Sequence, residues 1–125
     1  MSLDQFCEEM KSKFPSLSEK AEKEYLKFWG EIVPEFYSYT WFNALARVLN
    51  TEMNKGVQPE EFKLLFSTIA VSFLNGSEEV KKAIDVSFVE NLFWNVSSKA
   101  SELHWSYFPE VLKKLYLEFH GKNPF

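Results

Sequence analysis

Cysteine is almost absent from this chain, which has one, Cys7, in 125 residues. A single thiol excludes an internal disulfide and is typical of proteins in a reducing compartment. Cys7 falls on the apolar face of a predicted helix, which favours a packed thiol over a nucleophile activated by a distant base. Histidine is also scarce, with only His104 and His120, whereas a zinc site needs about four ligands. We therefore expect no metal ion, and we expect both histidines at the surface or at helix ends.

Glycine is rare as well, with four residues that all fall in loops or at predicted helix ends. The chain has no glycine-rich phosphate loop, no dinucleotide-binding fingerprint and no serine in a nucleophile elbow. These absences remove the common catalytic motifs and the common cradle for a phosphate cofactor. We expect a protein that is not an enzyme and that binds no cofactor.

Basic residues are outnumbered, with 14 Lys and Arg against 18 Asp and Glu and a net charge of −4. No cluster of Lys or Arg is longer than two residues, and a nucleic acid partner would need a basic patch. An acidic balance instead suits a basic protein partner, because long-range attraction accelerates the encounter. We expect no nucleic acid partner.

Long apolar runs are missing, since no stretch approaches the 18 residues of a transmembrane helix. The first four residues lack the basic and apolar regions of a signal peptide. These two features predict a cytoplasmic protein that does not enter a membrane.

Aromatic residues, by contrast, are abundant: 13 Phe, 5 Tyr and 4 Trp make up 18% of the chain. This is more aromatic volume than a small core needs, so some rings are expected at the surface or in a groove. Five rings fall within residues 36–42, and adjacent helical residues point about 100° apart, so the core cannot take them all. Core packing, a protein interface and a ligand pocket all remain open for this run, and Trp94 raises the same question.

The spacing of apolar residues predicts an all-α fold: a single domain over residues 1–125 with about six to seven helices. The predicted helices cover residues 2–14, 16 or 18 to about 32, 34–53, 59–74, 77–92, 96–107 and 109–120. Ser2 and Ser77 are predicted N-caps, residues 16–19 form a capping-box pattern, and Gly121 follows the last helix. Short connections predict antiparallel neighbours.

Glu90 is the carboxylate with the most unusual surroundings in the sequence. On a helical wheel it lies beside Ala83, Val86 and Trp94, which predicts partial burial and therefore a hydrogen-bonding partner. That partner is either a neighbouring helix cap or Arg47, the only arginine, unless Glu90 faces another protein. The predicted partner-binding residues are the acids and rings expected at the surface: Glu78, Glu79, Asp85, Glu90, Tyr37, Trp41 and Trp94.

A family resemblance begins in residues 62–92, where two predicted helices are joined by NGSEEV and the second contains AIDVSFVENL. This helix–turn–helix segment is similar to a HEAT-like hairpin. It more closely resembles small bacterial all-helical proteins of unknown function, which carry a glycine, an acidic pair, a valine and then an apolar helix. The residues FPEVL at 108–112, followed by Gly121, resemble the same group, so the resemblance spans residues 60–121.

Several proteins of this group are regarded as immunity proteins, which bind and neutralise a toxin of the same bacterium. The resemblance therefore implies a protein that binds a toxin and performs no catalysis, and Glu90 matches the acidic position of the group. A general helical adaptor is the main alternative, and a protein that binds a small ligand is a third. The sequence leaves the oligomeric state open.

Overall fold

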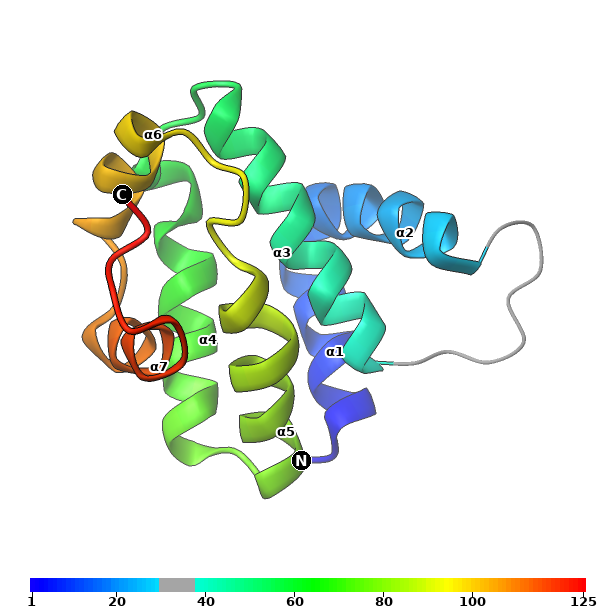
Figure 1. Cartoon of the computed structure of the whole chain (residues 1–125). Coiled ribbons are helices and arrows are strands. Elements are labelled where there is room, and N and C mark those ends of the chain that lie inside the picture. The colour runs from blue at the N-terminus through cyan, green and yellow to red at the C-terminus, as the bar shows by residue number, and fades with distance from the viewer. Residues whose placement is uncertain (30–37) are drawn as a thin grey trace.

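The computed structural model describes residues 1–29 and 38–125, and within them it contains seven α-helices and no β-strand (Figure 1). The prediction of a single all-α domain is confirmed for this part of the chain. The α-helices are α1 Leu3–Lys13, α2 Pro15–Trp29, α3 Ser38–Asn54, α4 Lys63–Asn75, α5 Glu78–Lys82, α6 Ser98–Trp105 and α7 Glu110–His120. Three short helical segments accompany them: η1 Pro59–Phe62, η2 Ala83–Phe88 and η3 Val89–Asn91. The predicted start of the third helix at residue 34 lies outside the described residues.

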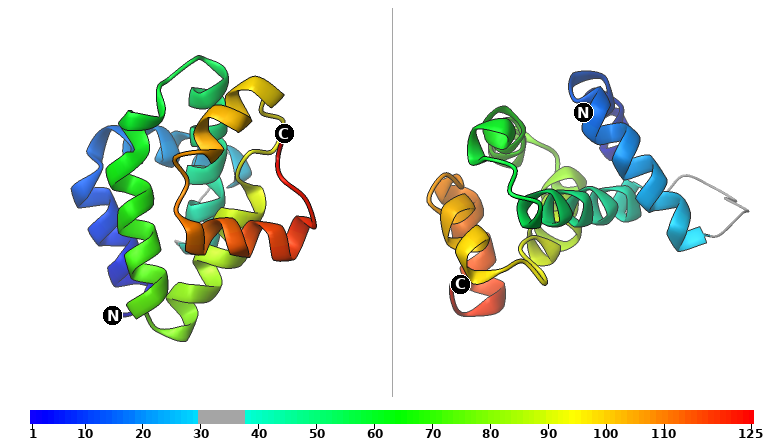
Figure 2. Two further views of the ribbon diagram at one scale, coloured as in Figure 1. Left: turned by 90° about the vertical axis from the view of Figure 1, so that its left-hand side faces the viewer. Right: turned by 90° about the horizontal axis from the view of Figure 1, so that it is seen from above.

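The helices pack in three groups along the molecule. Helices α1 and α2 lie on one side, α6 and α7 lie on the other, and α3, α4 and α5 stand between them (Figure 2). Helices α4 and α5 form an antiparallel hairpin (Figure 1). Helix α3 is the central element, because it packs against α2 on one side and against η2 and α6 on the other.

Local sequence signals fix several helix ends as predicted. The hydroxyl of Ser2 accepts a hydrogen bond from the N–H of Gln5, and the side-chain oxygen of Gln5 accepts one from the N–H of Ser2. The hydroxyl of Ser77 accepts from the N–H of Val80 at the start of α5. Gly121 adopts a φ of 75° after α7, which a residue without Cβ tolerates at low cost.

The start of α2 differs from the prediction. The capping-box pattern at residues 16–19 placed the N-cap at Ser16 or Ser18, but the helix already begins at Pro15. The N–H of Ser18 donates to the carbonyl of Phe14, so both serines lie inside the helix. Proline suits this position because a residue in the first helical turn has no intrahelical use for its N–H.

The thiol of Cys7 and the imidazole of His104, two groups that could take part in chemistry, both lie in the core. Cys7 is fully buried, and burial raises the pKa of its thiol to about 12, so the thiol is neutral at pH 7 as expected for a packed residue. His104 is also buried, which corrects the prediction that it lies at the surface or caps a helix. One ring nitrogen, Nε2, lies 2.8 Å from the carbonyl of Val57, and the other, Nδ1, has no hydrogen-bond partner.

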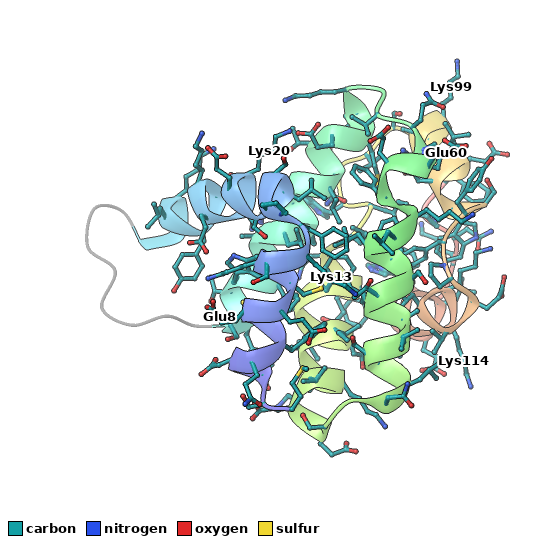
Figure 3. The ribbon with its side chains drawn as sticks, turned by 180° about the vertical axis from the view of Figure 1, so that it is seen from behind. Glu8, Lys13, Lys20, Glu60, Lys99 and Lys114 are labelled. Carbon is teal, nitrogen blue, oxygen red and sulfur yellow. The ribbon has the colours of Figure 1, made fainter. Side chains whose placement is uncertain are left out.

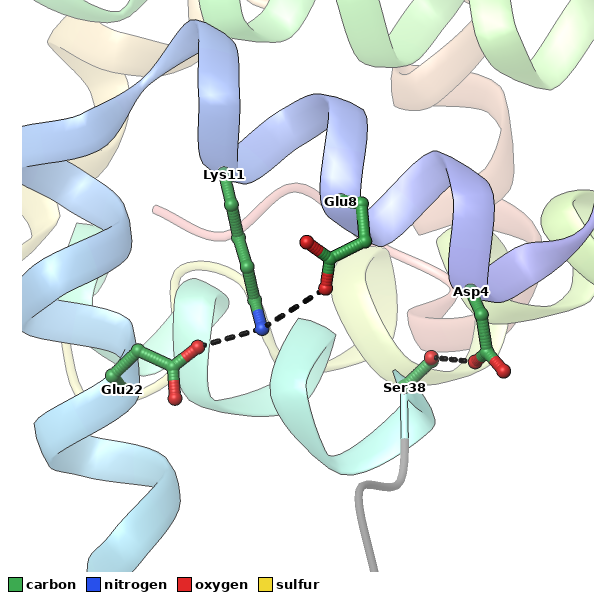
Figure 4. Close-up of polar contacts among 5 residues, drawn as sticks. All are labelled: Asp4, Glu8, Lys11, Glu22 and Ser38. Carbon is green, nitrogen blue, oxygen red and sulfur yellow. Dashed lines mark hydrogen bonds and ion pairs between the residues drawn. The ribbon is translucent and has the colours of Figure 1, made fainter.

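Polar contacts tie α1 to α2 and α3 (Figure 4). The hydroxyl of Ser38, at the start of α3, donates to Asp4 at 2.6 Å. The ammonium of Lys11 lies 2.8 Å from a carboxylate oxygen of Glu22 on α2 and 3.7 Å from one of Glu8 on its own helix. These contacts hold the N-terminal helices at a fixed position beside α3.

A pH-dependent contribution to stability is expected from His104. Burial lowers the pKa of this imidazole below its usual 6.5, and the hydrogen bond to Val57 and the charge of Glu60 only partly oppose the shift. The unfolded chain therefore binds the proton more readily than the folded one. The stability that the neutral ring supports is complete above pH 6.5 and is lost as the pH falls, by at most about 1.4 kcal/mol per pH unit for one proton.

The variant His104→Gln isolates this contribution, because its amide can still donate to Val57 but does not titrate. Urea unfolding of both proteins between about pH 7.5 and 5.5 measures the difference, and the other titrating groups cancel in the comparison. We expect the free energy of unfolding to fall more steeply with acid in the original chain. Parallel curves would show that His104 does not couple folding to pH.

No helix in the described ranges is long and apolar enough to cross a membrane.

Candidate protein-binding surface around Trp94

The segment after η3 presents one tryptophan to solvent between two strained residues. The helical region ends at Asn91, and Phe93 and Asn95 then adopt φ values of 68° and 58°, in the left-handed region. That conformation costs a residue with a Cβ roughly 1–2 kcal/mol. Between them, Trp94 is 73% exposed, whereas the ring of Phe93 is buried. The backbone therefore alternates one ring inward and the next ring outward.

The ring of Phe93 anchors this segment to the C-terminal helices. Its centroid lies 5.4 Å from that of Phe108 and 5.7 Å from that of Tyr116, both close to perpendicular. Trp105 contributes a third edge contact at 5.8 Å. Such edge-to-face pairs add to the free energy gained by burying the rings. The packing of Phe93 thus stabilises the strained backbone from which Trp94 projects.

Two asparagines one helical turn apart on α3 form hydrogen bonds with the main chain on both sides of Trp94. The side-chain amide of Asn50 donates to the carbonyl of Asn91 at 2.9 Å and accepts from the N–H of Phe93 at 2.7 Å. Asn54 repeats the pattern, donating to Asn95 at 3.0 Å and accepting from the N–H of Ser97 at 3.0 Å. We call this pair the asparagine clamp.

The asparagine clamp limits how far Trp94 can move. Four hydrogen bonds satisfy main-chain groups that no helix supplies with partners in this segment. A large exposed ring on a fixed backbone loses little conformational freedom when a partner covers it. A small hollow of about 220 Å³ lies beside the ring, lined by Arg47, Asn50, Asn91 and Trp94.

A separate group of acidic side chains, Asp85, Glu90 and Glu118, comes from η2, η3 and α7. Burial and then the charge of Glu118 raise the pKa of Asp85. Burial and then the charge of Asp85 raise the pKa of Glu90, while His120 opposes that shift. These carboxylates repel one another, so an incoming cation would relieve an unfavourable arrangement. Asp85 also lies in the π-helical segment η2, and π-helical turns are frequent at functional sites.

The structure tests part of the prediction for Glu90. Glu90 is half-buried, as expected. Its main-chain carbonyl lies 3.1 Å from Nε2 of His120, and the charges of Asp85 and His120 shift the pKa of its carboxyl in opposite directions. The helical wheel that placed Trp94 beside it is wrong, because the helix ends three residues before Trp94.

The remaining predicted site residues are dispersed. Glu78 and Glu79 are exposed at the start of α5, at the opposite end of that helical region from Trp94 (Figure 1). A carboxylate oxygen of Glu79 accepts from the N–H of Leu3, so this acid caps α1. Tyr37 lies outside the described residues.

Trp41 requires a correction. It was predicted to contact a partner, but it is only 1% exposed and therefore belongs to the core. Its ring meets Phe42 edge-on at 5.0 Å, and the ammonium of Lys11 lies 5.6 Å from its centroid. Of the aromatic run, Tyr39 remains partly exposed, so core packing accounts for Trp41 and Phe42.

Asn50 and Asn54 were not among the predicted site residues. Asn50 carries a signal in the sequence, because it stands between Leu49 and Met53 on the apolar side of the predicted helix, and the structure buries it. A buried amide requires partners, and it finds them on a segment about 40 residues away. Within residues 1–29 and 38–125, no group of three or more His, Cys, Asp and Glu residues is placed to hold a metal ion.

Comparison with known proteins gives a family and no activity. The family model described as Domain of unknown function (DUF7674) matches residues 7–121 of the chain. No curated protein and no solved structure matches the chain.

Proposed function

We propose that this chain, which belongs to the DUF7674 family of domains of unknown function, is a non-catalytic protein-binding domain that uses the surface around Trp94. More specifically, we propose that it is an immunity protein, which neutralises a cognate bacterial toxin by binding to it. The basic face of such a toxin would contact Asp85 and Glu90. The observation that carries the proposal is the exposed indole of Trp94 held by the asparagine clamp.

The position of Trp94 has the properties of an interface anchor. Tryptophan is enriched among the residues that dominate binding energy, and such residues lie near the centre of an interface, surrounded by contacts that exclude water. Polar groups of Arg47 and Asn91 border the ring, and they would form this surrounding zone. Because the backbone is fixed before binding, most of the free energy gained by burying the ring remains available for affinity.

The carboxylates of η2, η3 and α7 support a basic partner. The charge of Glu118 raises the pKa of Asp85, and the charge of Asp85 raises the pKa of Glu90, in each case after the larger effect of burial. A basic surface placed opposite them would associate faster, and more so at low ionic strength. Nucleases that act on nucleic acids carry such surfaces, and an acidic inhibitor is complementary to them.

Co-expression tests this function. The C-terminal domain of the product encoded immediately upstream is expressed in bacteria, and survivors are counted with and without this chain. We expect the original chain to restore growth and Trp94→Ala to fail. Loss of an anchor ring costs about 2 kcal/mol or more, which is roughly a 30-fold rise in Kd. The Kd for the purified domain is measured in parallel.

Two matched variants serve as controls. Tyr107→Ala removes another exposed ring, on the turn between α6 and α7, and is expected to rescue normally. Glu90→Lys is expected to slow association, whereas Glu78→Lys makes the same charge change at the far end of the helical region and is not. Equal rescue by Trp94→Ala and Tyr107→Ala would contradict the proposed surface. A harmless upstream product would contradict the immunity function.

A further inference from the structure

A groove runs between α2 and α3, and its walls are rich in lysine. It has a volume of about 310 Å³ and is lined on one side by Lys20, Lys23 and Lys27 of α2 and on the other by residues that include Lys55, just beyond α3. We call it the lysine groove. Lys27 lies seven positions after Lys20, so the lysines of α2 cover two turns of helix, about 10 Å.

The acids of the lysine groove lie deeper than its cations. Lys20 pairs with Glu52 at 2.8 Å, and the side chains are 53% and 12% exposed respectively. Lys27 pairs with Glu24 at 3.1 Å, and their side chains are 76% and 26% exposed respectively. The carboxylates are thus largely covered and neutralised, while the ammonium groups reach solvent. Charge at the mouth of the groove is positive.

Two further lysines add to this positive charge. Lys23 faces solvent and makes only a long contact of 3.8 Å with Glu19. Lys55 forms no ion pair with any residue in the described part of the chain. The chain as a whole has more acidic than basic residues, yet it gathers exposed cations in one concave place. An ordinary solvated helix face has no need of such a concentration of one charge.

The lysine groove leads towards Trp94. A second hollow of about 200 Å³ shares Glu24 and Thr51 with it and is lined at its far side by Arg47, Asn54 and Trp94. Both residues of the asparagine clamp therefore border this second hollow. A ligand lying along the groove would end against the exposed indole.

We propose that the lysine groove binds an acidic segment of a partner protein, and that Trp94 packs against an apolar residue that follows the acids. This inference deepens the proposed function, since it gives the partner an acidic segment beside the basic face that meets Asp85 and Glu90. In an extended segment each residue adds about 3.3 Å, so three to four residues span the lysines of α2. Successive side chains alternate between the groove and solvent, which suits alternating acids.

The direct test uses a peptide in place of a toxin. A fluorescein-labelled peptide of about eight residues that alternates Glu and Ala and ends in Leu is titrated with the intact chain, and anisotropy is recorded at low and high salt. The control peptide replaces every Glu with Lys. We expect the acidic peptide to bind, the basic one to bind at least about tenfold more weakly, and salt to weaken the former.

Charge-reversed variants locate the binding. Lys23→Glu with Lys55→Glu is expected to raise the Kd about tenfold, because two attractions become two repulsions. Lys99→Glu with Lys114→Glu changes the net charge equally. Those lysines lie on α6 and α7, away from α2 and Lys20 (Figure 3), so the Kd should stay within about twofold. Circular dichroism checks that each variant is folded. If Lys23→Glu with Lys55→Glu unfolds, the milder double variant Lys23→Gln with Lys55→Gln replaces it.

Three results would overturn the proposal. The first is equal binding of the acidic and basic peptides, and the second is an equal loss of affinity in the two double variants. The third is tighter binding of a single-stranded oligonucleotide of the same charge, which would assign the lysine groove to nucleic acid. The peptide assay contains no toxin, so a failed rescue contradicts the immunity function without affecting this result.

Discussion

Replacing Trp41 with alanine is expected to lower the free energy of unfolding by about 3–5 kcal/mol, the usual cost of removing a buried aromatic ring. The ring is 1% exposed and packs against Phe42 and beneath Lys11. Neighbouring side chains cannot fill the space, because helix α3 is held by α2 on one side and η2 on the other. Since a domain of this size is stable by only about 5–15 kcal/mol, the variant should unfold at a much lower urea concentration.

Trp94→Ala is the matched control for that experiment. It removes the same atoms from a side chain that is 73% exposed, so the free energy of unfolding should change by no more than about 0.5 kcal/mol. Equal losses in the two variants would contradict the assignment of one tryptophan to the core and the other to the surface. The pair also separates a defect in folding from a defect in binding, because only Trp94→Ala should bind poorly while remaining folded.

The all-α fold and most helix ends follow from local signals in the sequence. A serine before an apolar repeat or a glycine after it acts through atoms within a few residues, as Ser2, Ser77 and Gly121 do. Such signals compete when they lie close together. Ser16 and Ser18 were the predicted N-cap positions for α2, but the helix begins at Pro15.

The exposure of individual rings could not be predicted in the same way. Trp41 and Trp94 both stand among apolar neighbours in the sequence, yet one is buried and the other projects into solvent. The difference depends on which helices pack against α3 and on where the helical region ends after η2. The π-helical segment changes the direction of the residues that follow it, so a regular helical wheel fails there.

The asparagine clamp shows the same limit for polar residues. Its hydrogen bonds join residues 41 and 43 positions apart in the chain. The sequence indicates that Asn50 is polar on an apolar face and therefore needs partners, but it does not indicate which main-chain groups supply them. The lysine groove depends equally on tertiary structure, since its two walls come from different helices.

The proposed binding surface combines two kinds of charge. Acids gather on η2, η3 and α7, and the cations of the lysine groove gather between α2 and α3. A partner with a single sign of charge would meet repulsion on one side. A partner that places a basic face and an acidic segment together meets attraction on both, so this arrangement favours one orientation of the complex.

Asn50→Ala is expected to cost about 2–4 kcal/mol of folding free energy, because it leaves the buried N–H of Phe93 and the partly buried carbonyl of Asn91 without this partner. Asn54→Ala removes an equivalent pair of bonds at an exposed position, where water replaces them, and should cost less than about 1 kcal/mol. Urea unfolding compares the two variants. Similar values would contradict a special role for Asn50.

The same variant links stability to binding. Without Asn50, the main chain at Asn91 and Phe93 loses both of its hydrogen bonds to this side chain. The left-handed conformation of Phe93 is then supported by its ring contacts with α6 and α7, and Trp94 is held less firmly. Asn50→Ala should therefore weaken binding of the toxin domain while the indole is still present, measured at a temperature where the variant remains folded. Hydrogen exchange of residues 92–97 should increase in parallel. Undiminished binding with increased exchange would show that the position of Trp94 need not be fixed in advance, and that its exposure alone supports recognition.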